Sequence, residues 1–199
     1  ILLGQIVDRY GLDRPGEIHL PELLRRVAAV PGILRVRFLT SHPRWITDEL
    51  IATVASTPGL CPYFEIPVQA GSDAVLAAMR RGYTAADYEA LVARVRAALP
   101  HVGLSTDVIV GFPGEIAAQF EETLALMRRV DPDMIRVAKY SPRPLTYSAR
   151  HLPDDVPEVE KERRRVALEA QLRARLTEKN APLLGQTVDI LVESIEKNG

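Results

Sequence analysis

The stretch Ser105-Thr-Asp-Val-Ile-Val-Gly-Phe-Pro-Gly-Glu115 carries the strongest signal for the fold. Val108 to Val110 is a short β-branched run, typical of a strand that is buried on both faces. Gly111 and Gly114 can take positive φ angles or approach a ligand closely, and Pro113 lies between them in a tight turn. Because ligands of α/β proteins bind beyond the carboxyl ends of parallel strands, this turn is a candidate wall of a binding site. The alternative is a strand-to-helix turn with a structural role only.

The composition is that of an ordinary globular protein, with 47% hydrophobic and 26% charged residues among 199. The formal net charge of −1 gives no bulk attraction to nucleic acid or membrane, so such a partner would have to meet a local patch. No apolar run approaches the roughly 18 residues of a membrane span, and no leader sequence is recognisable, so we expect a cytoplasmic protein with no membrane partner. Cys61 is the only cysteine, which excludes an internal disulfide and an all-cysteine metal site made by this chain alone.

Hydrophobic periodicity predicts strands and helices in alternation. Strands are expected at 1–7, 33–40, 63–68, 108–110 and 134–140, and helices at 20–30, 47–56, 73–79, 84–99, 117–130 and 158–180. The segment 141–157, with Pro144, Pro153 and Pro157, is expected to be a loop, and 186–192 an isolated strand. The alternation indicates an α/β fold with a parallel sheet, open or closed into a barrel. Because the first residue is Ile1 in a predicted strand, we expect an internal piece of a longer protein.

The carboxyl ends of such strands gather on one rim of the sheet. The rim would hold residues 4–5, 41–42, 69, 107–111 and 140–143. Glycine, glutamine, serine, aspartate and tyrosine suit a polar organic cofactor bound by hydrogen bonds. The rim lacks the histidine and carboxylate sets of a protein-made metal site, so no metal ligand is predicted. No acid, base or nucleophile is predicted either.

Four linked motifs at this rim resemble a known family. They are Thr40-Ser-His-Pro43, Ile66-Pro-Val-Gln-Ala-Gly-Ser-Asp73, Asp107-Val-Ile-Val-Gly-Phe-Pro-Gly-Glu115 and Tyr140-Ser-Pro-Arg-Pro144. Their order and spacing resemble the radical S-adenosylmethionine methylthiotransferases, over essentially the whole chain. The first two look more like the tRNA-modifying branch than the branch that modifies a ribosomal protein. The resemblance implies a radical enzyme that adds a methylthio group to C2 of an N6-modified (isopentenylated) adenosine near the anticodon of tRNA.

The resemblance also implies a domain organisation and a set of cofactors. Residues 1–182 would form an incomplete TIM-like barrel from its second strand onward, and 183–199 the truncated start of a C-terminal β domain of the TRAM type, which binds RNA. The full-length parent would use S-adenosylmethionine, two 4Fe-4S clusters and an electron donor for cluster reduction. The family's Cys-x-x-x-Cys-x-x-Cys loop is absent here, so this chain alone is expected to hold no cluster and to be inactive.

The resemblance assigns roles to individual rim residues. It implies that Gly4 and Gln5 meet the amino group of S-adenosylmethionine, that Gln69 reaches the ribose, and that the strand end at 109–111 meets the adenine. The full cofactor-binding prediction comprises Gly4, Gln5, Ser41, Gln69, Asp107, Ile109, Gly111 and Tyr140, and the substrate-binding prediction His42 and Arg143. Two positions depart from the family pattern: Ile6 replaces the usual Asn, and Leu145 replaces the usual Gly, which implies a differently shaped substrate loop.

Several alternatives stay open at this level. The chain could be part of a ribosomal-protein methylthiotransferase, or a non-catalytic barrel that binds RNA or protein. Gln69 could be a surface amide, and His42 could hydrogen-bond a neighbouring loop. Arg163 to Arg165 could contact RNA, but the nearby glutamates 158, 160 and 162 favour a solvated helix face. Cys61 is interpreted as a small apolar side chain.

Overall fold

A three-stranded parallel sheet lies at the centre of the computed structural model, which describes residues 1–188 and 190. The strands are β1 (Tyr63–Glu65), β2 (Gly103–Val110) and β3 (Met134–Lys139), in the order β1-β2-β3. Both pairings are parallel, with Phe64 opposite Leu104 and Thr106 opposite Ile135. The predicted α/β fold with a parallel sheet is therefore confirmed.

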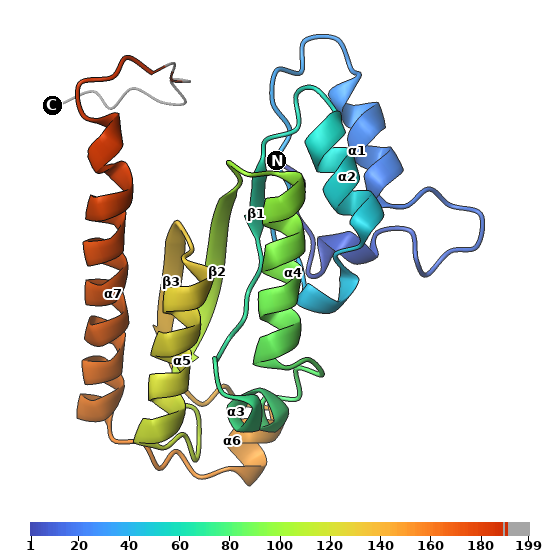
Figure 1. The fold of residues 1–199 in the computed structure, drawn as a ribbon. Helices are drawn as coiled ribbons and strands as arrows, with labels where there is room; N and C mark the ends of the chain where they lie inside the picture. The colour runs from blue at the N-terminus through green and yellow to red at the C-terminus, as the bar shows by residue number, and fades with distance from the viewer. Residues whose placement is uncertain (189, 191–199) are drawn as a thin grey trace, which may run out of the picture.

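Helices surround this sheet (Figure 1). In that view α4 and α5 lie in front of the strands, α7 runs alongside β3, and α1 and α2 lie beyond β1. The α-helices are α1 (Leu20–Ala28), α2 (Asp48–Ser56), α3 (Asp73–Ala78), α4 (Ala85–Ala98), α5 (Ala117–Val130), α6 (Tyr147–His151) and α7 (Glu158–Asn180). Three short 3-10 turns accompany them, η1 (Val7–Arg9), η2 (Pro43–Trp45) and η3 (Ala181–Leu183). No helix of the described residues is long and apolar enough to cross a membrane.

Helix starts follow the capping signals in the sequence. The Thr47 side chain accepts a hydrogen bond from the backbone of Leu50 and so caps the start of α2. Thr84 and Asp87 form a capping box at the start of α4. Helices α5 and α7 have the predicted bounds.

Two of the predicted strands are wrong. Segments 1–7 and 33–40 are extended but joined only by single parallel bridges, Leu2 to Phe38 and Val36 to Leu60. The first segment turns into η1 at Val7, so its pairing stops after one bridge. Segment 33–40 nevertheless alternates buried and exposed side chains as a strand does: Val36 and Phe38 are buried, whereas Arg35 and Arg37 are exposed.

The central strands also differ in length from the prediction. Strand β1 ends at Glu65 because Pro67 has no N–H for the ladder and Val68 donates to the Thr106 side chain instead, at 3.1 Å. Strand β2 begins at Gly103, before the apolar run 108–110. Hydrophobic periodicity did not predict the first part of this strand, because Ser105 and Thr106 are polar although both are buried.

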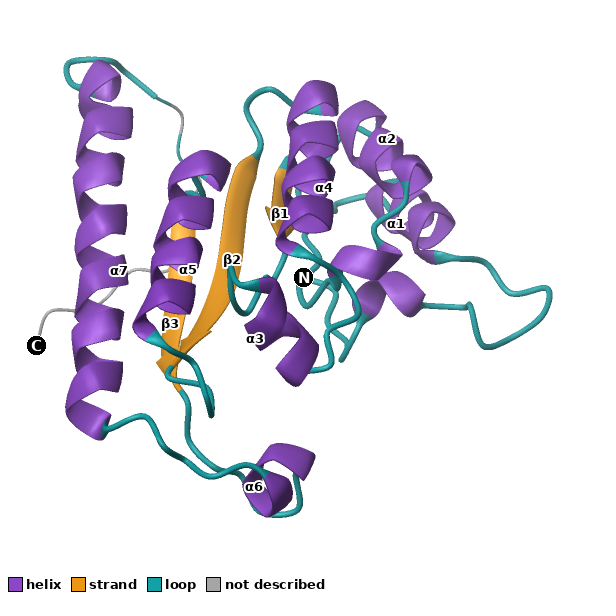
Figure 2. Cartoon of the chain, turned by 60° about the horizontal axis from the view of Figure 1, so that its bottom comes forward, coloured by secondary structure: helices purple, strands orange, loops and turns teal. Residues whose placement is uncertain are grey.

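The chain after β3 contains a helix that the sequence did not indicate. The loop predicted for 141–157 includes α6, whose N-cap Thr146 accepts a hydrogen bond from Ala149 at 3.3 Å. Figure 2 shows α3 and α6 near the ends of the strand arrows. The predicted strand at 186–192 lies mostly outside the described residues, and Gln186 to Val188 form no strand. The TRAM-type domain therefore stays a prediction.

Two hydrophobic clusters hold the elements together. The larger one joins the sheet to α1, α2, α4, α5 and α7 through side chains such as Phe64, Tyr88, Phe120 and Leu168. The smaller one lies at the carboxyl ends of the strands and comprises Ala70, Val75, Leu76, Tyr83, Phe112 and Tyr140. The second cluster fixes α3 and the ends of β2 and β3 relative to one another, and so supports the rim where the site was predicted.

Candidate cofactor and substrate site

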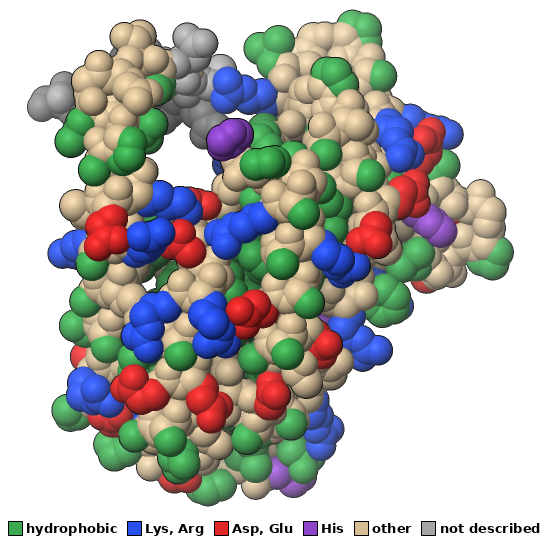
Figure 3. Space-filling model, in the orientation of Figure 1, with side chains coloured by type: hydrophobic (Ala, Val, Ile, Leu, Met, Phe, Trp, Pro, Cys, Tyr) green, Lys and Arg blue, Asp and Glu red, His purple; other side chains and the backbone are tan. Residues whose placement is uncertain are grey.

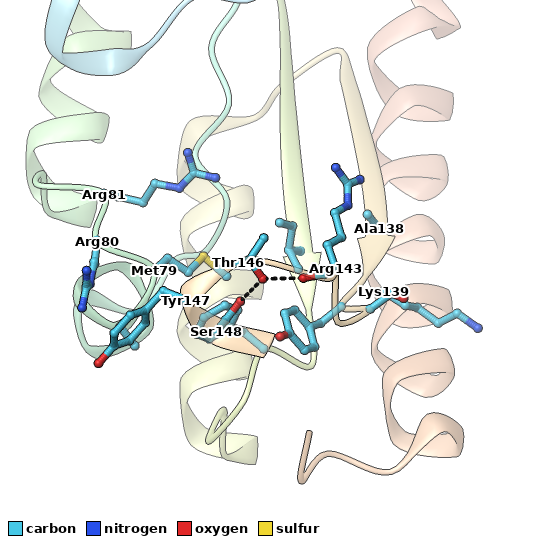
Figure 4. A pocket seen from close by; sticks show the side chains of 14 residues that line it. Met79, Arg80, Arg81, Ala138, Lys139, Arg143, Thr146, Tyr147 and Ser148 are labelled. Atoms are coloured by element: carbon cyan, nitrogen blue, oxygen red, sulfur yellow. Dashed lines mark hydrogen bonds between the residues drawn. The ribbon is translucent and has the colours of Figure 1, made fainter. Parts of the chain in front are cut away.

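A cavity of about 400 Å³ opens at the carboxyl ends of β2 and β3. Figure 4 shows that its walls come from the end of α3, the end of β3 and the segment 143–148. The residues that matter below are Met79, Ile109, Phe112, Tyr140, Arg143 and Tyr147. Its volume lies within the range of small-molecule sites. The predicted site residues Ile109, Tyr140 and Arg143 are thus brought together on one cavity.

The inner wall of the cavity is aromatic. The rings of Phe112 and Tyr140 meet edge to face, with centroids 5.2 Å apart, and both residues are buried. Ile109 packs against the same cluster. Such a wall can contact the flat face of a purine while excluding water from it.

The turn after β2 is held by α7. Gly111 has a φ of 71° and donates from its N–H to Glu115 Oε2 at 2.6 Å. Arg164 of α7 donates to the same oxygen at 2.8 Å and to the Glu115 carbonyl at 3.0 Å. Burial raises the pKa of the Glu115 carboxyl, against the hydrogen bonds from Gly111 and Arg164. The glutamate thus links the turn to α7.

Lys161 of α7 contacts the residues that follow β2 and β3, Gly111 and Tyr140. Its ammonium donates to the Tyr140 carbonyl at 3.1 Å and to Asp154 Oδ1 at 2.5 Å. A Cβ on Gly111 would overlap the aliphatic part of the Lys161 side chain. The close approach at Gly111 is therefore to Lys161, and Gly111 itself does not line the cavity.

Sequence reasoning missed Lys161 and Arg164. The sequence of α7 is rich in charged residues, which predicts a solvated helix. Lys161 and Arg164 are nevertheless only 3% and 4% exposed. They share a spacing of three and four with the buried Leu168, so they occupy the inward face of α7. That spacing is the signal that could have found them.

Five buried side-chain atoms have no hydrogen-bond partner among the described residues. They belong to residues at the strand-end rim: Asp8 Oδ1, Ser41 Oγ, Arg81 Nε, Asp107 Oδ1 and Tyr140 Oη. Buried polar atoms of this kind call for an explanation, since each unmade hydrogen bond costs about 1–3 kcal/mol. Three of the five residues, Ser41, Asp107 and Tyr140, are predicted cofactor contacts, although Asp107 Oδ1 also lies in an ion pair with Arg136 at 3.6 Å. The donor and acceptor set fits a polar organic ligand.

Asp8 is a rim residue that the sequence analysis missed. Its Oδ2 accepts a hydrogen bond from the His42 backbone at 3.0 Å, and burial raises the pKa of its carboxyl to about 6. It follows an apolar segment, the same signal that identified the other rim residues. The predicted Gly4 and Gln5, by contrast, are exposed and lie outside the cavity.

Backbone strain is concentrated at the same rim. Four of the five non-glycine residues with positive φ among the described residues are Thr40 (69°), Gln69 (76°), Arg80 (56°) and Leu145 (73°). Such conformations persist at functional sites because the surrounding structure enforces them. At Gln69 the ladder enforces it, since the Gln69 N–H donates to Asp107 and its carbonyl accepts from Ile109, both at 2.9 Å.

The family of the chain follows from a comparison with known proteins. A model of the radical SAM superfamily matches residues 9–127, which include the bridged segment 33–40, β1, β2 and the turn after β2. The chain belongs to the radical SAM superfamily. Strands β1 and β2 and the rim residues Ser41, Arg81 and Asp107 therefore lie within the matched radical SAM region.

Individual relatives agree with this family. The tRNA-2-methylthio-N(6)-dimethylallyladenosine synthase of Chloroflexus aurantiacus is 50% identical, over 98% of this chain and 43% of its own length. The protein of the same name from Dehalococcoides mccartyi is 47% identical, over 100% of this chain and 47% of its own. The chain thus spans about half the length of the curated relatives it matches.

A solved structure supports the same fold. Coproporphyrinogen III oxidase from Escherichia coli, described as a radical SAM enzyme, matches with a TM-score of 0.57 and 20% identity. The match covers 81% of this chain and 36% of that one. At this identity it shows the fold alone.

His42, a predicted substrate contact, lies at this rim within its own loop. His42 Nδ1 accepts from the Arg44 backbone at 3.3 Å, and its ring meets Tyr83 edge to face at 5.5 Å. Burial, followed by the charges of Arg81 and Arg44, lowers the pKa of His42. These contacts favour the interpretation of His42 as a neutral residue that holds its own loop.

The structure also shows the conformation of Leu145 and the ion pairs of the arginine run 163–165 in α7. Leu145, where the family usually has glycine, keeps the left-handed conformation that glycine adopts without strain. Arg163 pairs with Glu160 at 2.7 Å, and Arg165 pairs with Glu162 at 2.6 Å. With Arg164 buried, the run is neutralised by carboxylates and offers no open cationic patch.

Proposed function

We propose that the complete protein is a tRNA methylthiotransferase that adds a methylthio group to C2 of N6-dimethylallylated adenosine near the anticodon. The 47–50% identity to relatives that carry this name supports the substrate. The observation that carries the proposal for this chain is the set of five buried polar side-chain atoms that have no hydrogen-bond partner among the described residues, at the rim of a radical SAM fold.

The rim would bind S-adenosylmethionine. In this proposal Ser41, Gln69 and Asp107 supply polar contacts, Ile109 and Tyr140 contact the adenine, and Gly4, Gln5 and Gly111 are secondary contacts. Bound S-adenosylmethionine, next to a reduced 4Fe-4S cluster, supplies a radical that removes hydrogen from an unactivated C–H bond. The residues of this chain bind and orient the cofactor, and Phe112 with Tyr140 excludes water from it. In this proposal Arg143 contacts the substrate, and His42, predicted from the sequence as a second substrate contact, holds its own loop on that side.

The proposal extends to parts beyond the described residues. With Cys61 as the single cysteine of this chain, the cysteines for two 4Fe-4S clusters would belong to the rest of the complete protein, as would contact with an electron donor. The sheet would be part of a TIM-like barrel over 1–182, and 183–199 would begin a TRAM-type domain.

An activity measurement tests this function. The complete protein is reconstituted anaerobically with iron and sulfide, then supplied with reductant, S-adenosylmethionine and tRNA from a strain that lacks the gene. We expect 5′-deoxyadenosine and a methylthio-adenosine nucleoside by mass spectrometry. Modification of a ribosomal protein in place of tRNA would identify the other branch, and absence of 5′-deoxyadenosine would indicate a non-catalytic barrel.

A further inference from the structure

Many cations of the described residues pair with carboxylates, whereas others, in several parts of the fold, form no ion pair. On the face formed by α4, α5 and α7, basic and acidic side chains are interspersed (Figure 3), and several form ion pairs, such as Arg129 with Glu89 at 3.0 Å and Arg175 with Asp131 at 2.8 Å. None of the ion pairs within the described residues involves Arg44, Arg80, Arg81 or Arg143. The formal net charge of the chain is −1, but these four arginines carry positive charge that no ion pair within the described residues neutralises.

These four arginines, which we call the arginine rim, lie together at the strand ends. Arg80, Arg81 and Arg143 line the cavity, and Figure 4 shows Arg81 and Arg143 on opposite sides of it. The Arg44 guanidinium packs against Gly82, where an added Cβ would come within 2.9 Å of Nη1. Arg80, Arg81 and Arg143 thus bring positive charge to one cavity, with Arg81 close enough to the Asp107 carboxylate for the two charges to interact. A cavity with this charge favours an anionic partner.

An aromatic stack stands next to the arginine rim. The Arg80 guanidinium carbon lies 3.7 Å from the centroid of the Tyr147 ring, as Figure 4 shows. On Tyr147, the His151 ring stacks at 4.3 Å with an interplanar angle of 20°. Tyr147 is 48% exposed, but Arg80 and His151 cover its two faces. The planes of the stack that a base can reach at the mouth of the cavity are therefore the outer planes of the Arg80 guanidinium and the His151 ring.

We propose that the arginine rim and Tyr147 bind a single-stranded segment of RNA across the mouth of the cavity, with the arginines on its phosphates and the stack against an unpaired base. Guanidinium groups without carboxylate partners suit phosphates, and unstacked RNA bases bind on aromatic and arginine planes. An acidic protein segment would complement the charge of the arginines, but it has no base to stack on Arg80, Tyr147 and His151. This inference rests on the proposed function for the identity of the RNA as tRNA.

Binding of a fluorescently labelled anticodon stem-loop RNA to the complete protein tests the inference. Fluorescence anisotropy is measured over a series of salt concentrations, without S-adenosylmethionine or reductant. We expect Arg80→Gln and Arg143→Gln each to weaken binding about fivefold to tenfold and to reduce the slope of log affinity against log salt by roughly 0.7. Tyr147→Ala should weaken binding about fivefold or more, whereas Tyr147→Phe should bind normally because it keeps the ring.

Arg163→Gln is the matched control, since Arg163 is exposed but paired with Glu160. We expect its RNA affinity and salt slope to equal those of the unmodified protein. The inference is overturned if Arg163→Gln weakens binding as much as Arg80→Gln, if the rim variants keep the full salt slope, or if polyglutamate competes as well as RNA.

The methylthiolation assay separates this inference from the proposed function. If the unmodified protein methylthiolates tRNA but the rim variants bind RNA normally, the inference is wrong and the function stands. If RNA binding depends on the arginine rim but no tRNA is modified, the inference holds and the proposed reaction is wrong. Melting temperatures of the variants confirm that each one is folded.

Discussion

The buried pair of Arg164 and Glu115 is expected to hold the turn after β2 in place. The two side chains are 4% and 1% exposed and lie 2.8 Å apart. In Arg164→Met the aliphatic length is kept, so the main loss is the guanidinium with its two hydrogen bonds to the buried Glu115 and its one to the more exposed Glu160. Removing one partner of a buried ion pair costs about 3–5 kcal/mol, because the other charge stays buried without compensation.

Protonation limits this cost. Burial already raises the pKa of Glu115, and loss of Arg164 would raise it further, so the carboxyl can take up a proton at about 1.4 kcal/mol for each pH unit above its pKa. We therefore expect about 3 kcal/mol at pH 7, and a smaller effect at pH 5, where protonation is easier.

Hydrogen exchange of the complete protein measures the effect locally. The amide of Gly111, which donates to Glu115, should exchange about 100-fold faster in Arg164→Met at pH 7, as expected for a loss of about 3 kcal/mol in opening free energy. Arg165→Met is the control, because Arg165 is one residue away but pairs with Glu162 and Glu169 on the solvent side. Its exchange should change by less than about threefold.

A double variant tests the role of charge. In Glu115→Gln with Arg164→Met, the amide can still accept from Gly111, and no unpaired charge is buried, so exchange should be slower than in Arg164→Met alone. Equal exchange in the double and single variants, or equal exchange in Arg164→Met and Arg165→Met, would refute the reasoning.

Three further predictions concern the rim of the complete protein. Gly111→Ala should lower the unfolding free energy by more than about 2 kcal/mol, since it combines a positive φ with overlap on Lys161; Gly114→Ala, which has a positive φ but open space, should cost only about 1 kcal/mol, and equal melting temperatures would contradict this. The pKa of Asp8 is raised from 3.8 to about 6, so the folded state holds the extra proton and the unfolding free energy should fall by about 3 kcal/mol as pH rises from about 4 to 6; urea unfolding of Asp8→Asn should lack this decrease, and an unchanged pH profile would count against it. Gln69→Ala should weaken S-adenosylmethionine binding about fivefold by calorimetry, from loss of about 1 kcal/mol; normal binding together with a much lower melting temperature would make Gln69 a structural amide.

Local sequence patterns determined much of the fold. The bounds of α5 and α7 and the N-caps of α2 and α4 depend on spacings within a few residues. The parallel sheet was predicted from the alternation of strands and helices along the chain. The same patterns indicated which strand ends would share a rim, and Ile109, Tyr140 and Arg143 do line one cavity. Local periodicity could not detect where pairing stops, because a strand needs a partner segment and 33–40 has only single bridges.

Only the tertiary structure decided how charges are used. Arg164 and Glu115 are 49 positions apart, and the sequence around Arg164 is the same whether the side chain is solvated or buried. The packing of α7 on β3 buries Arg164 and Lys161 against the turn, while leaving Arg163 and Arg165 to pair with glutamates of their own helix. Likewise, it is the folded rim that leaves Arg80 and Arg143 without an ion pair among residues 1–188 and 190. The sequence determines which charges exist, but the low dielectric of the interior and the distance between side chains, which exist only after folding, decide whether a charge is neutralised, buried or left available to a ligand.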